Sequence, residues 1–82
     1  MNSNHQRKLF AVNKNQIRQL LGRGDGLPMP PSTWRRWWRD HQIHEKLQMS
    51  ETEFSKAQWF YLERYEALKA VIGFDEGDLA EL

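Results

Sequence analysis

The chain has 82 residues, of which 39% are hydrophobic and 12% aromatic, enough for one small domain with a modest core. The formal charge is +1, but the charges are unevenly placed. Residues 1–48 carry nine basic and three acidic side chains, a net +6, whereas residues 49–82 carry three basic and eight acidic ones, a net −5. The length excludes a multidomain enzyme, and the absence of cysteine excludes disulfides, thiolate metal sites and a cysteine nucleophile.

The ends of the chain are polar. We expect residues 1–8 to form a flexible tail, residues 9–73 to form the folded domain, and residues 74–82 to form an acidic tail. No apolar stretch near Met1 suits a signal peptide, and no run approaches the ~20 apolar residues that a membrane span needs. These features predict a cytoplasmic protein that does not contact a membrane.

The first expected helix covers residues 14–21. Asn13 is a favourable N-cap, and Gln16 completes a capping-box pattern three residues later. Apolar side chains then follow with helical spacing, and Gly22 suits the position directly after a helix. Two glycines and three prolines within residues 23–31 predict a long turn before the next element.

The second expected helix begins with Ser32 as its N-cap and runs to residue 41. Helical spacing separates its side chains into an apolar face and a basic face. The apolar face holds Trp34, Trp37, Trp38 and His41, and the basic face holds Arg35, Arg36 and Arg39.

The third expected helix is long, covering residues 51–72, and begins with a capping box formed by Ser50 and Glu53. Residues 42–49, which precede it, fit a pair of strands, an extended linker or a continuation of the second helix. The apolar stripe of the long helix repeats near 3.5 residues, and it could serve only the domain's own core. Its extra aromatic side chains favour a surface for a partner or for a homodimer, formed by Trp59, Phe60 and Tyr65.

The basic face of the second helix predicts contact with double-stranded DNA, although exposed arginines are often only solvated. Arginine donates paired hydrogen bonds to guanine O6 and N7 and also binds phosphate. A short helix fits the major groove, and basic side chains at the start of the first helix would contact backbone phosphates. The expected DNA-binding residues are Arg35, Arg36, Arg39, Thr33, Lys14, Asn15, Arg18 and Arg23.

Other chemical patterns are weak. The three histidines, His5, His41 and His44, have no third ligand placed by spacing, so we expect no metal site. The tripeptide at residues 23–25 spells a cell-adhesion motif, which is frequent by chance. Because the chain has no nucleophile triad, phosphate loop or carboxylate pair, we expect no enzymatic activity, no cofactor and no small-molecule substrate.

Two segments resemble the helix-turn-helix of MerR-like and excisionase-like regulators. Residues 16–22 (QIRQLLG) are similar to the family pattern E-V-A-x-L-L-G, and residues 32–39 (STWRRWWR) are similar to its second helix. The turn containing Gly26, Leu27 and Pro28 also resembles Mu-type phage transposase and repressor DNA-binding domains. The turn is longer than in excisionase-like proteins, and Arg18 stands where the family has a small residue.

The resemblance covers residues 9–49 and implies a fold as well as a function. The implied fold is mainly α, a three-helix helix-turn-helix domain with room for a short β-wing between helices 2 and 3. The implied protein is a bacterial or phage DNA-binding protein whose helix 32–41 enters the major groove, with Arg35, Arg36 and Arg39 facing the DNA and Thr33 near a phosphate.

Several functions stay open at this point. The protein could be a transcriptional regulator, or an accessory factor of a phage or plasmid that bends DNA as excisionases do. A binder of single strands that stacks bases on tryptophan is a further alternative. A different class is a small adaptor that binds another protein through the acidic, aromatic helix 51–72.

Overall fold

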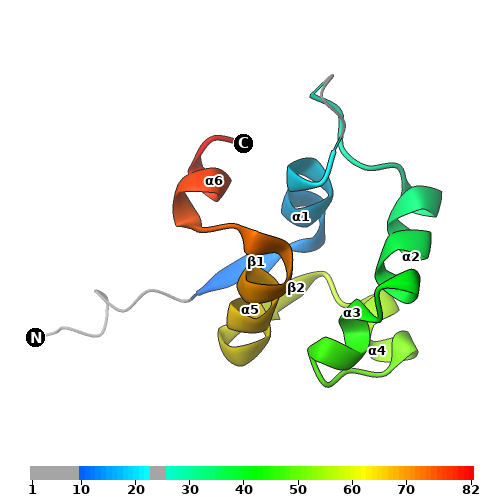
Figure 1. Ribbon diagram of the computed structural model, residues 1–82. Helices are drawn as coiled ribbons and strands as arrows, with labels where there is room; N and C mark the ends of the chain where they lie inside the picture. The colour runs from blue at the N-terminus through cyan, green and yellow to red at the C-terminus, as the bar shows by residue number, and fades with distance from the viewer. Residues whose placement is uncertain (1–9, 23–25) are drawn as a thin grey trace, which may run out of the picture.

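Short helices and one two-stranded ribbon make up the computed structural model, which describes residues 10–22 and 26–82 (Figure 1). In chain order the elements are β1 (Ala11–Asn13), α1 (Lys14–Leu20), α2 (Pro31–Asp40), α3 (Ile43–Lys46), α4 (Glu51–Lys56), β2 (Trp59–Tyr61), α5 (Leu62–Leu68), the π-helical segment η2 (Lys69–Gly73) and α6 (Glu76–Ala80). The expectation of a mainly α fold is therefore confirmed. Among the helices of the described ranges, none combines the length and the apolar character that crossing a bilayer requires.

The ribbon joins the two halves of the chain. β1 pairs antiparallel with β2, and Val12 lies opposite Phe60 in the register. Both of these side chains are fully buried, whereas Trp59 and Tyr61, which alternate with Phe60, point outward and are about half exposed. In Figure 1, α1, α5 and α6 surround the ribbon, and α2, α3 and α4 lie together on the other side of the molecule.

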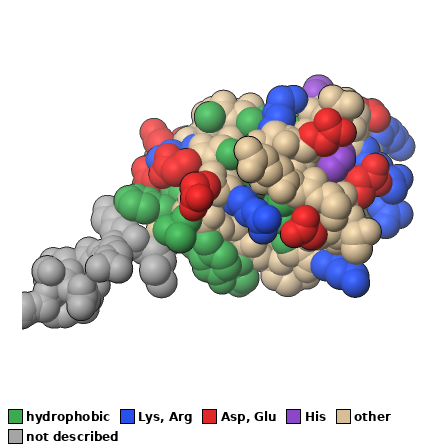
Figure 2. All heavy atoms as spheres, turned by 90° about the horizontal axis from the view of Figure 1, so that it is seen from below, with side chains coloured by type: hydrophobic (Ala, Val, Ile, Leu, Met, Phe, Trp, Pro, Cys, Tyr) green, Lys and Arg blue, Asp and Glu red, His purple; other side chains and the backbone are tan. Residues whose placement is uncertain are grey.

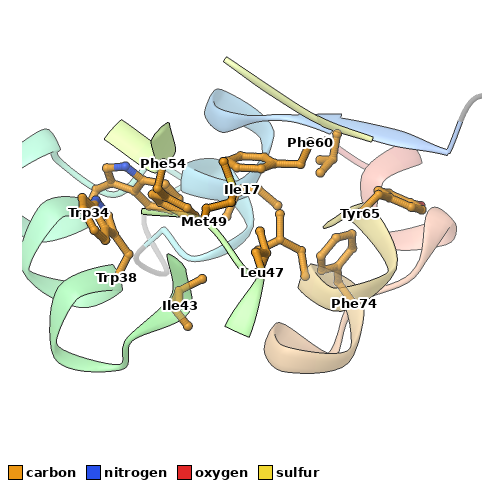
Figure 3. Packing of buried hydrophobic residues seen from close by; sticks show 12 residues of the cluster. Ile17, Trp34, Trp38, Ile43, Leu47, Met49, Phe54, Phe60, Tyr65 and Phe74 are labelled. Carbon is orange, nitrogen blue, oxygen red and sulfur yellow. The ribbon is translucent and has the colours of Figure 1, made fainter. Parts of the chain in front are cut away.

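The core contains a cluster of aromatic rings with Phe54 at its centre. Its ring centroid lies 5.9 Å from Trp34, 4.7 Å from Trp38 and 5.2 Å from Phe60. Figure 3 shows the two indoles of α2 packed beside Phe54, which comes from α4. Because Phe54 also contacts the ribbon through Phe60, this cluster fixes α2 against the rest of the domain.

The start of α1 agrees with the sequence prediction. The Gln16 amide donates to Asn13 Oδ1 at 2.8 Å, and the Asn13 amide donates to Gln16 Oε1 at 2.9 Å, which completes the capping box. After the helix, the chain passes so close to itself that a Cβ on Gly22 would lie 2.0 Å from the Leu27 carbonyl oxygen. Glycine is needed there because any side chain would collide with backbone.

The start of α2 differs from the prediction. Pro30, not Ser32, occupies the N-cap position, and Pro31 is the first helical residue. Proline suits this position because its fixed φ is already helical and its missing N–H would have no partner within the helix. The Trp34 amide donates to the Pro30 carbonyl at 2.8 Å and closes the first turn.

A β-wing does not form between the second and third predicted helices. Residues 42–49 instead contain the single-turn helix α3, flanked by Gln42 and Gln48 in left-handed conformation with φ of 55° and 60°. The Met49 amide donates to the His44 carbonyl at 2.8 Å and folds the segment back on itself. These bonds satisfy the backbone locally, so no strand ladder is required.

The single long helix expected over residues 51–72 is wrong. The capping box of Ser50 and Glu53 does begin a helix, with both hydrogen bonds at 3.0 Å, but α4 ends at Lys56. Ala57 adopts an extended conformation with ψ of 133°, and residues 59–61 form β2. A run of three aromatic residues favours a strand, and pairing with β1 buries Phe60 in the core.

Candidate nucleic-acid interface

The two faces of α2 have opposite characters. Trp34 and Trp38 are only 6% and 3% exposed, and Trp37 is half-buried against Trp34 with ring centroids 5.4 Å apart. Arg35 and Arg36 lie on the outer surface and are exposed. The indoles therefore hold the helix in one orientation while its arginines face solvent.

The arginines of α2 differ in their partners. The Arg39 guanidinium lies 3.1 Å from the Glu51 carboxylate at the start of α4, and it also lies 5.8 Å from the centroid of the Trp38 ring. Within the described ranges, Arg35 and Arg36 form no ion pair with an acidic side chain. The uncompensated positive charge of α2 therefore belongs to Arg35 and Arg36.

A hollow of about 430 Å³ lies between α1, α2 and α4, and we call it the α1–α2–α4 groove. Its wall contains three cationic side chains, two serines, two indoles and one proline. The lining residues are Lys14, Arg18, Pro31, Ser32, Trp34, Arg35, Trp38 and Ser55. A second hollow of about 210 Å³ continues past Arg35 and Trp38 toward the pair formed by Arg39 and Glu51.

Backbone hydrogen bonds hold two of the cations of the groove in place. Lys14 Nζ donates to the Ser55 carbonyl at 2.8 Å, and Arg18 Nε donates to the Met29 carbonyl at 2.7 Å. Burial, and then the nearby charge of Arg18, lower the pKa of the Lys14 ammonium from its usual value. These side chains thus have structural roles and also concentrate positive charge beside α2.

The predicted DNA-binding residues fall into two groups in the structure. Lys14, Arg18 and Arg35 come together around the groove. The other described residues of the set are exposed and do not line it; they are Asn15, Thr33, Arg36 and Arg39. Arg23 lies outside the described residues. Figure 2 shows Lys and Arg side chains gathered at the end of the molecule that carries α2 in Figure 1.

The predicted partner surface is largely buried, which corrects the sequence interpretation. Phe60 is fully buried opposite Val12, and Tyr65 is 1% exposed. The Tyr65 hydroxyl donates to the Glu76 carboxylate at 2.6 Å. Only Trp59 of the three is exposed, and its ring is stacked on Tyr61 with centroids 6.2 Å apart. The alternation within β2 explains the difference between Phe60 and Trp59, whereas Tyr65 lies in α5 and its ring packs against Phe74.

Sequence reasoning missed the part of the groove that α4 supplies. Ser55 lines the groove and Lys56 lines the second hollow, and both are separated from Lys14 by about half of the chain. No local pattern brings them together, because the contact depends on how Phe54 of α4 packs against Trp34 and Trp38 of α2. In the described part of the chain, no group of three or more potential ligands is placed to hold a metal ion.

Comparisons with family models, with curated proteins and with solved structures give no match to this chain. The resemblance to MerR-like and excisionase-like domains therefore stays a prediction. Residues 21–30 separate α1 from α2, a longer connection than the three- or four-residue turn of a helix-turn-helix.

Proposed function

We propose that this protein is a small double-stranded DNA-binding protein that inserts α2 into the major groove. The observation that carries the proposal is the pair of exposed arginines, Arg35 and Arg36, on a helix whose opposite face is fixed in the core by two indoles. Neither arginine has an acidic partner in the described ranges, so both are available to a ligand.

The dimensions and chemistry of α2 suit this role. A helix of ten residues is about 15 Å long and fits a major groove that is about 12 Å wide. Guanidinium groups donate to guanine edges or to phosphates, and nearby cations add sequence-independent affinity. The mechanism is occupancy of a DNA site without chemistry, as in a transcriptional regulator or an accessory factor of a phage or plasmid.

The test is a fluorescence anisotropy titration with labelled duplexes selected from a random pool, at ~50 mM salt where electrostatic binding is strong. We expect the double variant Arg35→Ala, Arg36→Ala to bind at least about tenfold more weakly than the wild type, since each contact contributes about 1–3 kcal/mol. The control is Lys46→Ala, Arg64→Ala, which removes the same charge from a separate hollow beside α3 and α5.

Circular dichroism should show that both double variants keep the wild-type helix content. Equal affinity of the two double variants would contradict the assignment of α2 as the DNA-contacting helix. If the wild type retards no duplex at all, the protein-binding adaptor becomes the better hypothesis.

A further inference from the structure

We propose that the α1–α2–α4 groove is a phosphate-binding pocket that receives a backbone phosphodiester of the duplex. The source of the phosphate rests on the proposed function, but the pocket itself does not. The proposal starts from the charges in the wall, where the described lining residues include Lys14, Arg18 and Arg35 and no acidic side chain. Cations without an anion among the lining residues attract a negatively charged group from solution.

The donors of the pocket are only partly used by the protein. Among the described residues, Lys14 Nζ donates to the Ser55 carbonyl, which uses one of its three N–H groups. Arg18 uses its Nε to bind the Met29 carbonyl, which leaves the two terminal NH₂ groups of its guanidinium. The wall therefore retains charged donors of the kind that bind phosphate oxygens most strongly.

The same hydrogen bonds order these side chains before a ligand arrives. A lysine or arginine on an open surface must lose rotamer freedom when it binds a phosphate, which weakens the contact. Here the bonds to Ser55 and Met29 restrict Lys14 and Arg18 in advance. Burial is the main cause of the lowered pKa of Lys14, and the nearby charge of Arg18 adds to it.

The position of the pocket explains how it would assist α2. Arg35 belongs both to the pocket and to the exposed face of α2. A phosphodiester held between Lys14 and Arg35 would therefore fix the position of α2 along one DNA strand. Contacts of this type set the register of the protein but carry no sequence information.

The indoles of the wall provide a spectroscopic test. Trp34 and Trp38 line the pocket, whereas Trp59 lies on the ribbon, so the indole N–H signals of ¹⁵N-labelled protein report binding at separate places. We expect inorganic phosphate at millimolar concentration, with ionic strength held constant by chloride, to shift the signals of Trp34 and Trp38 but not that of Trp59.

Two glutamate variants localise the site. Ser32 lines the pocket and its neighbour Thr33 does not, although both lie in the first turn of α2. A carboxylate in the first turn favours the helix, so Ser32→Glu and Thr33→Glu should both keep or raise the urea midpoint. We expect Ser32→Glu to abolish the shifts caused by phosphate and Thr33→Glu to retain them.

Duplex titrations with the variant Lys14→Ala test whether the pocket receives a DNA phosphate. The substitution should weaken binding by a similar factor for every duplex sequence and reduce the slope of log K against log salt by ~0.9, the value for one lost phosphate contact. Lys14→Gln, which keeps a donor toward Ser55 without the charge, should show the same loss.

The outcomes separate the pocket from the proposed function. If phosphate leaves Trp34 and Trp38 unshifted, the pocket is refuted even when the duplex binds. If phosphate binds but both Lys14 variants bind duplex like the wild type, the backbone assignment is overturned and the pocket takes a free phosphate. If phosphate binds but no duplex does, the proposed function and the backbone assignment fail while the pocket stands.

Discussion

Replacement of Phe54 by leucine tests whether the aromatic cluster fixes α2. Phe54 is fully buried and has ring contacts with Trp34, Trp38 and Phe60. Aromatic pairs contribute about 0.5–1.5 kcal/mol each beyond their buried area. Leucine keeps much of the apolar contact, so we expect Phe54→Leu to lower the free energy of unfolding by about 2 kcal/mol. Alanine, which costs about 3–5 kcal/mol, would approach the whole stability of a domain of this size.

The assay is urea denaturation followed by far-ultraviolet circular dichroism and by tryptophan fluorescence, with an expected decrease of about 1–2 M in the midpoint. The matched control is Trp59→Leu, which also replaces an aromatic ring by leucine but at a position that is 46% exposed. It should change the free energy of unfolding by less than about 0.5 kcal/mol. Equal effects of the two substitutions would refute the central role of Phe54.

Three further predictions concern local contacts. Hydrogen bonds from Tyr65 and then Lys69 lower the pKa of Glu76 to about 2 from the ordinary value of 4.5. The ionised Glu76 carboxylate therefore stabilises the fold fully above the unfolded-state pKa. This stabilisation is lost as the pH falls from about 4.5 toward 2. Unfolding measured across that range should therefore depend less on pH in Glu76→Gln than in the wild type, and parallel curves would contradict this. Ser50→Ala should lower the free energy of unfolding in urea by about 1 kcal/mol because it removes an N-cap. Ser32→Ala should lower it much less, because Pro30 occupies the N-cap of α2. Equal losses would contradict the assigned caps. Glu51→Gln releases Arg39 from an exposed ion pair, so it should tighten duplex binding about two- to fivefold in an anisotropy titration, and unchanged affinity would argue against Arg39 facing the DNA.

Features encoded by neighbouring residues could be predicted from the sequence. The capping boxes at Asn13 and Ser50 involve residues three positions apart, so they mark the starts of α1 and α4 without any tertiary information. The separation of tryptophans from arginines on α2 follows in the same way from helical periodicity.

Features that depend on distant contacts could not be predicted. The apolar spacing of residues 54–72 fits a helix, but Phe60 is instead buried opposite Val12, which is remote in sequence. That pairing interrupts the expected helix and buries Phe60, while Tyr65 is buried in α5 with its ring against Phe74. The groove beside α2 was missed for the same reason, because the hydrogen bond between Lys14 and Ser55 joins segments that are remote in sequence.

The central claim is that Arg35 and Arg36 contact duplex DNA, and the salt dependence of binding tests it most directly. If both guanidiniums neutralise phosphates, their removal reduces the slope of log K against log salt by about 1.8, twice the ~0.9 expected for one contact. We predict this decrease for Arg35→Ala, Arg36→Ala between 50 and 200 mM salt and the wild-type slope for Lys46→Ala, Arg64→Ala. Parallel lines for all three proteins, with equal affinities at every salt concentration, would contradict the account.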